Sequence, residues 1–307
     1  MAKKKYWNVI KLLLKLGFTC LLGYLVFQKI DFGQVKSVFL RSHPGYIIAA
    51  FTCYLCSQLV SSWRLLGFLH TIGLPVKFWF NVRLYLLGMF YNVFLPGGIG
   101  GDGYKIYLLR KKIRLPTKSI FTALLLDRVS GLWAISFLAV VLTLLLPSFP
   151  TKEWWPVAII VGTVVYWLIY KFFFPSYLAG FFINNGKAVL VQSLQVCTAF
   201  LILLSQDFNG DVWVYLFCFL MSSLATAIPV SIGGLGIREY AIVNAAAFFN
   251  MDQTLAVFMT LAFYIISTLS ALPGAWFVYN SSEFEHIPNE EEAKSVEDDV
   301  AKPVHLH

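Results

Sequence analysis

Long runs of apolar residues dominate the chain. Eight such windows follow one another, each close to the roughly 20 residues that an α-helix needs to cross a hydrocarbon core about 30 Å thick. This pattern predicts an all-α polytopic membrane protein with no folded soluble domain. The windows are Val9–Phe27, Tyr46–Leu69, Phe78–Leu95, Ser119–Leu146, Trp155–Phe174, Ala188–Leu204, Val212–Ile228 and Leu255–Tyr279.

Two windows end in glycine-rich breaks, LPGGIGGDG at Leu95–Gly103 and IPVSIGGLG at Ile228–Gly236. The breaks align with each other at an offset of 133 residues, which identifies an internal repeat. The repeat predicts two halves, about 5–147 and 148–280, in one transmembrane domain that spans residues 1–280. The aligned pairs are Pro96 with Pro229, Ile99 with Ile232, Gly100 with Gly233, Gly101 with Gly234, Gly103 with Gly236, Lys105 with Arg238 and Tyr107 with Tyr240.

The charges of the loops bear on whether a broken segment crosses the membrane. Six bases lie between Lys105 and Lys118, and the N-terminus is also rich in lysine, so both are expected on the cytoplasmic side. A re-entrant hairpin after two full spans satisfies both placements. Three crossings and a hairpin in each half then make the halves inverted relative to each other. Six spans with two re-entrant hairpins is therefore our prediction, and eight full spans is the alternative.

Composition agrees with a membrane location and argues against nucleic acid as a partner. Hydrophobic residues make up 58% of the chain and charged residues 13%, whereas soluble domains are about 25% charged. The net charge is +8, but the bases flank apolar windows, as the positive-inside rule describes. We expect a bacterial cytoplasmic membrane, both termini in the cytoplasm and an acidic, disordered tail over residues 281–307.

The glycine breaks are the first candidate site. Glycine allows close approach of a ligand, and the free amides at a helix start attract anions. Lys105 and Arg238 follow the two breaks at matching positions, so we predict a phosphate or carboxylate between two opposed hairpin tips. In the alternative, the cations reach the membrane surface and the glycines serve helix packing. The candidate substrate-binding residues are Asn92, Pro96, Gly98, Gly100, Gly101, Asp102, Lys105, Pro229, Ser231, Gly233, Gly234, Gly236, Arg238 and Glu239.

Three further ionisable residues, Arg64, Asp127 and Arg128, are embedded in apolar sequence. Such residues are costly in a bilayer and usually face the protein interior. Asp127 and Arg128 are adjacent and point about 100° apart on a helix, so each is expected to find a partner on another segment. They form either a polar path for a substrate or a structural network.

No catalytic motif, metal site or cofactor is predicted. The histidines are isolated, and no HExxH, GxSxG or Walker A sequence is present. Cys53-x-x-Cys56 has metal-ligand spacing but lacks a second pair and a nearby histidine, which favours a role in helix packing.

At these motifs the chain resembles the transmembrane region of lysylphosphatidylglycerol synthases and the related stand-alone membrane proteins. The matching elements are Asn92–Lys105 (NVFLPGGIGGDGYK), Leu125–Arg128 (LLDR) and Pro229–Glu239 (PVSIGGLGIRE), with Arg64 after the second span. In the synthases this region is taken to translocate an aminoacylated lipid, and a cytosolic aminoacyltransferase domain follows it. Here a short acidic tail stands in that place, so lysyl-lipid synthesis by this chain alone is not expected.

The resemblance implies a lipid flippase that moves an anionic, phosphate-bearing lipid or lipid-linked head group. A membrane lipid is the expected partner. One alternative is a membrane-embedded transferase that uses Asp102, Asp127 or Glu239 as a base. Another is an accessory subunit of a lipid-modifying enzyme. The sequence leaves the oligomeric state open.

Overall fold

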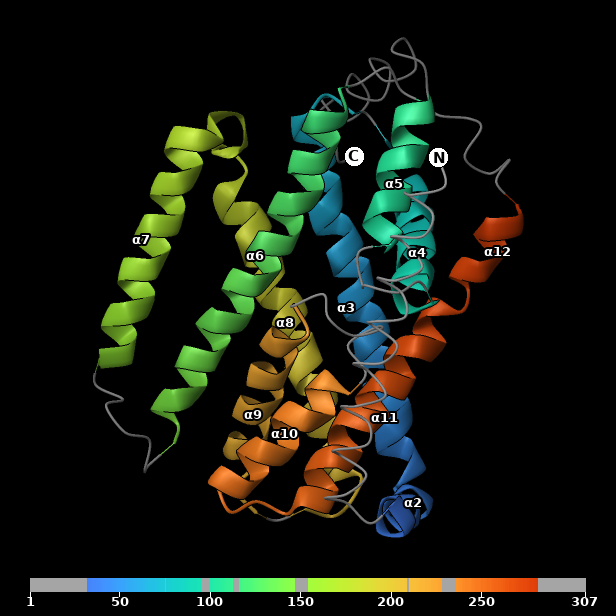
Figure 1. The fold of residues 1–307 in the computed structure, drawn as a ribbon, viewed down its shortest axis with the longest axis vertical. Helices are drawn as coiled ribbons and strands as arrows, with labels where there is room; N and C mark the ends of the chain where they lie inside the picture. The colour runs from blue at the N-terminus through green and yellow to red at the C-terminus, as the bar shows by residue number, and fades with distance from the viewer. Residues whose placement is uncertain are drawn as a thin grey trace, which may run out of the picture.

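The computed structural model describes residues 32–74, 76–94, 100–112, 116–146, 154–208, 210–227 and 236–280. Every regular element in these ranges is a helix (Figure 1). The helices are α2 (Phe32–Arg41), α3 (Pro44–Thr71), α4 (Phe78–Phe94), α5 (Gly100–Lys112), α6 (Thr117–Leu144), α7 (Trp155–Phe173), the short 3-10 helix η2 (Pro175–Tyr177), α8 (Phe181–Leu204), α9 (Val212–Ala225), α10 (Ile237–Phe248), α11 (Gln253–Ala271) and α12 (Gly274–Tyr279).

Five stretches are long and apolar enough to cross a membrane: α3, α6, α7, α8 and the run Gln253–Val278 through α11 and α12. The chain is thus a multi-pass membrane protein, as predicted. The first expected span, Val9–Phe27, lies outside the described residues. One boundary was wrong: α8 begins at Phe181, seven residues before the predicted Ala188. Polar residues interrupt the apolar pattern at the start of this helix. They have partners on neighbouring helices, such as Tyr166 for Asn185.

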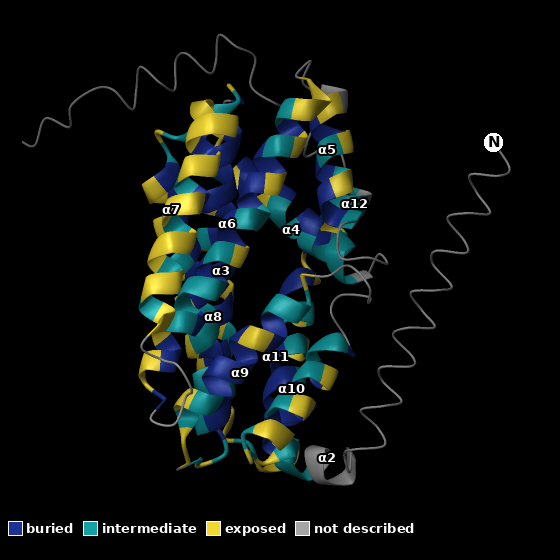
Figure 2. Ribbon diagram, turned by 60° about the vertical axis from the view of Figure 1, so that its left-hand side comes forward, coloured by how far each residue is buried: buried dark blue, intermediate teal, exposed yellow. Residues whose placement is uncertain are grey.

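The four helices beside the glycine breaks are shorter than the five candidate spans. They have 17, 13, 14 and 12 residues in α4, α5, α9 and α10, or about 18–26 Å at 1.5 Å per residue. The pair α4 and α5 lies in the upper part of the molecule and the pair α9 and α10 in the lower part (Figures 1 and 2). This arrangement favours the predicted pair of inverted hairpins over eight full spans.

The repeat is visible in the order of the helices. Counterparts in the two halves are α3 and α8, α4 and α9, α5 and α10, and α6 and α11. Each second-half helix starts between 134 and 137 residues after its counterpart, close to the offset of the glycine breaks. The counterparts α3 and α8 pack along each other through the middle of the molecule (Figure 1).

Each hairpin has a hydrophobic core of its own. Around the first hairpin, Leu84 and Leu87 of α4 and Leu109 of α5 are fully buried against α3 and α6. Around the second, Leu220 of α9 and Ile242 of α10 are fully buried against α11. The long helices α3, α6 and α8 contribute to both cores and hold the hairpins in one body.

Removing the N-cap of α11 should destabilise the protein modestly. Oδ1 of Asp252 accepts hydrogen bonds from the backbone N–H groups of Thr254 at 2.8 Å and Leu255 at 3.2 Å. Asp252→Ala leaves both donors without this acceptor, at a cost of about 1 kcal/mol. Thermal unfolding in detergent measures the loss. Asp252→Asn retains a capping oxygen, so equal melting temperatures for the two variants would contradict this role.

Candidate functional site

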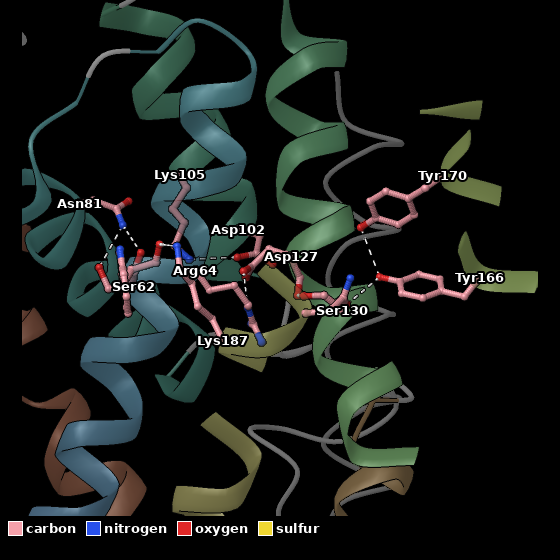
Figure 3. Close-up of polar contacts among 12 residues, drawn as sticks. Ser62, Arg64, Asn81, Asp102, Lys105, Asp127, Ser130, Tyr166, Tyr170 and Lys187 are labelled. Carbon is pink, nitrogen blue, oxygen red and sulfur yellow. Dashed lines mark hydrogen bonds and ion pairs between the residues drawn. The ribbon is translucent and has the colours of Figure 1, made fainter. Parts of the chain in front are cut away.

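A group of charged side chains lies beside the first hairpin, and all of them except Arg128 are buried (Figure 3). We call it the buried ion cluster: Arg64 from α3, Asp102 and Lys105 from α5, and Asp127 and Arg128 from α6. Side chains from α3 and from the consecutive helices α5 and α6 thus meet at one polar centre. The cluster holds three cations and two carboxylates, which leaves one positive charge in excess.

Arg64 and Asp127 form the deeper ion pair of the cluster. Nε of Arg64 donates to Oδ1 of Asp127 at 2.7 Å, and the residues are 6% and 8% exposed. The guanidinium lies over Gly131 of α6, where a methyl group would contact Nη1 at 3.5 Å. Nη1 itself has no hydrogen-bond partner within the described part of the chain.

Asp102 joins the other two cations. Its Oδ1 accepts from Nζ of Lys105 at 3.3 Å, and its Oδ2 accepts from Nε of Arg128 at a shorter distance. Asp127 and Arg128, although adjacent, therefore pair with α3 and α5 respectively. The prediction that each finds its partner on another segment is confirmed.

Lys105 is 4% exposed and extends along α4. Its chain crosses Gly88 so closely that a methyl group there would overlap Cε of the lysine. Its Nζ stands 4.8 Å from the ring centroid of Tyr85. An aromatic face stabilises a desolvated cation by about 0.5–2 kcal/mol, so Tyr85 and Asp102 together hold the ammonium group inside the protein.

Polar residues around the cluster form hydrogen bonds with side chains of other helices. Nδ2 of Asn81 donates to Oγ of Ser62 at 2.9 Å, which ties α4 to α3. On the other side, the hydroxyl of Tyr166 lies 3.2 Å from that of Tyr170 and 3.3 Å from Oδ1 of Asn185 (Figure 3). These contacts link α7 to α8 and enclose the cluster from that direction.

The second hairpin presents Arg238, the repeat counterpart of Lys105, in different surroundings. Its guanidinium lies over the rings of Phe263, at 4.9 Å, and Phe219, at 5.5 Å. No carboxylate forms an ion pair with it among the residues that the structure describes. The neighbouring Glu239 turns back to its own helix, where Oε2 accepts from N–H of Gly236 at 2.7 Å.

One tyrosine accompanies each of the two cations. Tyr85 of α4 lies beside Nζ of Lys105, and the ring of Tyr54 of α3 packs edge to face on Phe263, over which the guanidinium of Arg238 lies. Along α3, Tyr54 and Arg64 are ten residues apart, or about 15 Å. Helix α3 therefore passes from the surroundings of Arg238 to the buried ion cluster.

The predicted site is described only in part. Near the first break, Oδ1 of Asn92 accepts from N–H of Gly101 at 2.9 Å and closes the hairpin tip. Both cations lie on the returning arms, Arg238 in the first turn of α10 and Lys105 in the second turn of α5, where it is already paired with Asp102. An anion between the two cations stays a prediction. Outside the described residues are Pro96, Gly98, Pro229, Ser231, Gly233 and Gly234.

Sequence reasoning missed Tyr54, Tyr85 and Gly88. Both tyrosines lie well inside their apolar windows, and that position was the available signal. Gly88 is the lone glycine within its window. A single glycine in a long apolar run is a weak indication of close side-chain approach, and the lysine that crosses it comes from another helix.

The chain is similar to known membrane proteins over most of its length. The family model of the lysylphosphatidylglycerol synthase TM region matches residues 12–188. A UPF0104 membrane protein of Methanocaldococcus jannaschii, MJ1078, is 29% identical over 226 residues, which are 62% of this chain and 94% of that protein. A second UPF0104 membrane protein of this archaeon, MJ1595, is 25% identical over 119 residues, or 38% of this chain and 35% of that protein.

Proposed function

We propose, from the premise that this chain belongs to the family of the lysylphosphatidylglycerol synthase TM region, that it is a lipid translocase. Its substrate is an anionic lipid or lipid-linked head group that carries a phosphate. The observation that carries this proposal is Arg238, a cation at the start of the returning arm of a hairpin, held by aromatic rings and not by a carboxylate in the described structure.

The energy balance around Arg238 favours an anionic ligand. A cation in the membrane interior costs a few kcal/mol, and contacts with aromatic rings return about 0.5–2 kcal/mol each. A phosphate oxygen hydrogen bonded to the guanidinium adds a charge-assisted contact, which the fork-shaped donor suits well. The excess positive charge of the buried ion cluster acts in the same sense from the first hairpin.

The positions of the two cations suggest the route of the head group. Broken helices that meet near the middle of a membrane are the usual setting of transporter sites. Arg238 and the buried ion cluster are two cationic stations for an anionic head group. Tyr85 lies beside Lys105 at the first hairpin, and Tyr54 packs on the ring that lies against Arg238 at the second.

The two alternatives have less to support them. A transferase needs a carboxylate that is free to act as a base. Asp102 and Asp127 are both held in ion pairs. Oε2 of Glu239 caps α10, and its Oε1 is buried without a hydrogen-bond partner in the described residues. The residues described contain no feature that singles out an enzyme partner, so the accessory-subunit reading has nothing specific to support it.

Arg238→Gln should slow lipid translocation at least about tenfold, because one charge-assisted hydrogen bond contributes about 1.5–3 kcal/mol. The measurement is the loss of inner-leaflet fluorescence from proteoliposomes that contain a labelled phosphatidylglycerol and are exposed to dithionite. Vesicles without protein set the background rate. Arg110→Gln removes an exposed arginine of α5 and should translocate normally. Normal translocation by Arg238→Gln would contradict the proposal.

A further inference from the structure

The two hairpins differ in whether they carry an internal counter-ion. At the offset of 133 residues, Asp102 corresponds to Leu235, so the second half has an apolar residue at that position. Lys105 is paired with Asp102, whereas Arg238 has no ion pair in the described structure. The repeat has therefore kept a cation in both halves but a matching carboxylate in one.

Asp102 has two cationic partners. Charge-assisted hydrogen bonds between nitrogen and a carboxylate usually measure about 2.7–2.9 Å, and the Lys105 contact, at 3.3 Å, is longer than this. The other carboxylate oxygen accepts from Nε of Arg128, so Asp102 does not depend on Lys105 alone. When Lys105 leaves, Asp102 is still paired with Arg128 and is not left as an isolated buried charge.

Lys105 has a second partner besides Asp102. Its flexible chain passes over Gly88, and its ammonium already stands over the ring of Tyr85. Because an aromatic face attracts a cation, Tyr85 can hold the ammonium group while it exchanges one anion for another.

We infer that Asp102 is an internal counter-ion that competes with the phosphate of the lipid for Lys105. In the empty protein Asp102 holds the lysine. When a phosphate-bearing head group arrives, Lys105 exchanges its carboxylate for the phosphate, and Asp102 keeps Arg128. Return of the lysine to Asp102 then releases the head group. This inference rests on the proposed function and adds a positioning role for Asp102.

The inference predicts opposite effects on binding and on turnover. Asp102→Asn removes the competitor, so a phosphate-bearing lipid should bind about tenfold more tightly, the effect of one charge-assisted hydrogen bond. Translocation should become slower, because no carboxylate at position 102 then competes for Lys105 and promotes release of the head group. A carboxylate with a purely structural role would instead weaken both binding and transport when replaced.

The test is a double-mutant cycle in detergent with wild type, Asp102→Asn, Lys105→Gln and the double variant. The probe is dioctanoyl phosphatidic acid, titrated by calorimetry. Dioctanoylglycerol tests whether the phosphate is needed, and inorganic phosphate tests whether the lipid part is needed. The gain in affinity from Asp102→Asn should vanish when Lys105 is also glutamine. A gain that persists in the double variant would mean a general charge effect and overturn the inference.

Lys105→Gln alone keeps the test decisive if Asp102→Asn does not fold, because Asp102 retains Arg128 in this variant. The inference expects weaker binding of the phosphatidic acid and no change for dioctanoylglycerol. Unchanged binding of the phosphatidic acid would show that Lys105 belongs permanently to Asp102. If Arg238→Gln lost lipid binding while Asp102→Asn and Lys105→Gln bound the lipid as wild type does, this inference would be contradicted. The proposed function would still be supported.

Discussion

Arg64→Met is expected to lower the free energy of unfolding by about 3–5 kcal/mol, the usual cost of breaking a buried ion pair from one side. The cost comes from the carboxylate of Asp127, which remains in the protein interior when Arg64 is replaced. Asp127 is 8% exposed, and without Arg64 it becomes a buried carboxylate with no counter-ion in contact. Unfolding of the purified protein in mixed micelles, followed by the circular dichroism of its helices, measures the change.

The double variant Arg64→Met and Asp127→Leu supplies the control. It removes both charges and should recover most of the lost stability, since two apolar residues suit this interior better than one orphaned charge. Arg110→Met removes an exposed arginine of α5 and should have little effect. A double variant no more stable than Arg64→Met would show that the loss came from packing and not from the unpaired carboxylate.

Gly101→Ala is expected to disrupt the first hairpin. A methyl group at this position would overlap the carbonyl oxygen of Gly88, a backbone atom of α4 that cannot move aside without shifting the helix. Overpacking of this kind usually costs about 1–3 kcal/mol, and more where backbone must move. The substitution also displaces the amide that donates to Asn92. We therefore expect a lower melting temperature together with loss of translocation.

Gly103→Ala is the matched control for this substitution. It lies two residues further along the same helix, and a methyl group there would meet no atom within 4 Å. Alanine is favoured over glycine in a helix by about 0.5–1 kcal/mol, so Gly103→Ala should be neutral or slightly stabilising. If both variants lost the same stability, the cause would be flexibility of the glycine segment and not the contact between α4 and α5.

The architecture was predictable because it depends on signals that run along the chain. Window lengths predicted the spans, and the basic residues after Lys105 predicted a hairpin in place of a crossing. The start of α8 was missed for a physical reason: Asn184, Asn185 and Lys187 interrupt the apolar pattern. The helix tolerates them because other helices supply partners, such as Trp63, whose ring lies 4.3 Å from Nζ of Lys187.

The site was harder to predict because its contacts join distant segments. Sequence position placed Lys105 and Arg238 at equivalent points of the repeat, but in the structure Lys105 is the sixth residue of α5 and Arg238 the second of α10. What position could not show is that Arg128, 26 residues away, brings a second cation to Asp102. Nor could it show that Tyr85 of α4 lies beside Lys105, or that Tyr54 of α3 packs on the ring against Arg238. Such contacts follow from tertiary packing and leave no periodic trace.

The inverted hairpins also bear on the ancestry of the chain. Gene duplication copies a sequence, but it cannot turn the product upside down in a membrane. A half-length ancestor with an odd number of crossings must therefore have inserted in both orientations, which requires loops of nearly balanced charge. After fusion each copy kept one orientation. Its loops then diverged. Residues 105–118 now carry six bases, whereas residues 206–211 carry two acids and no base.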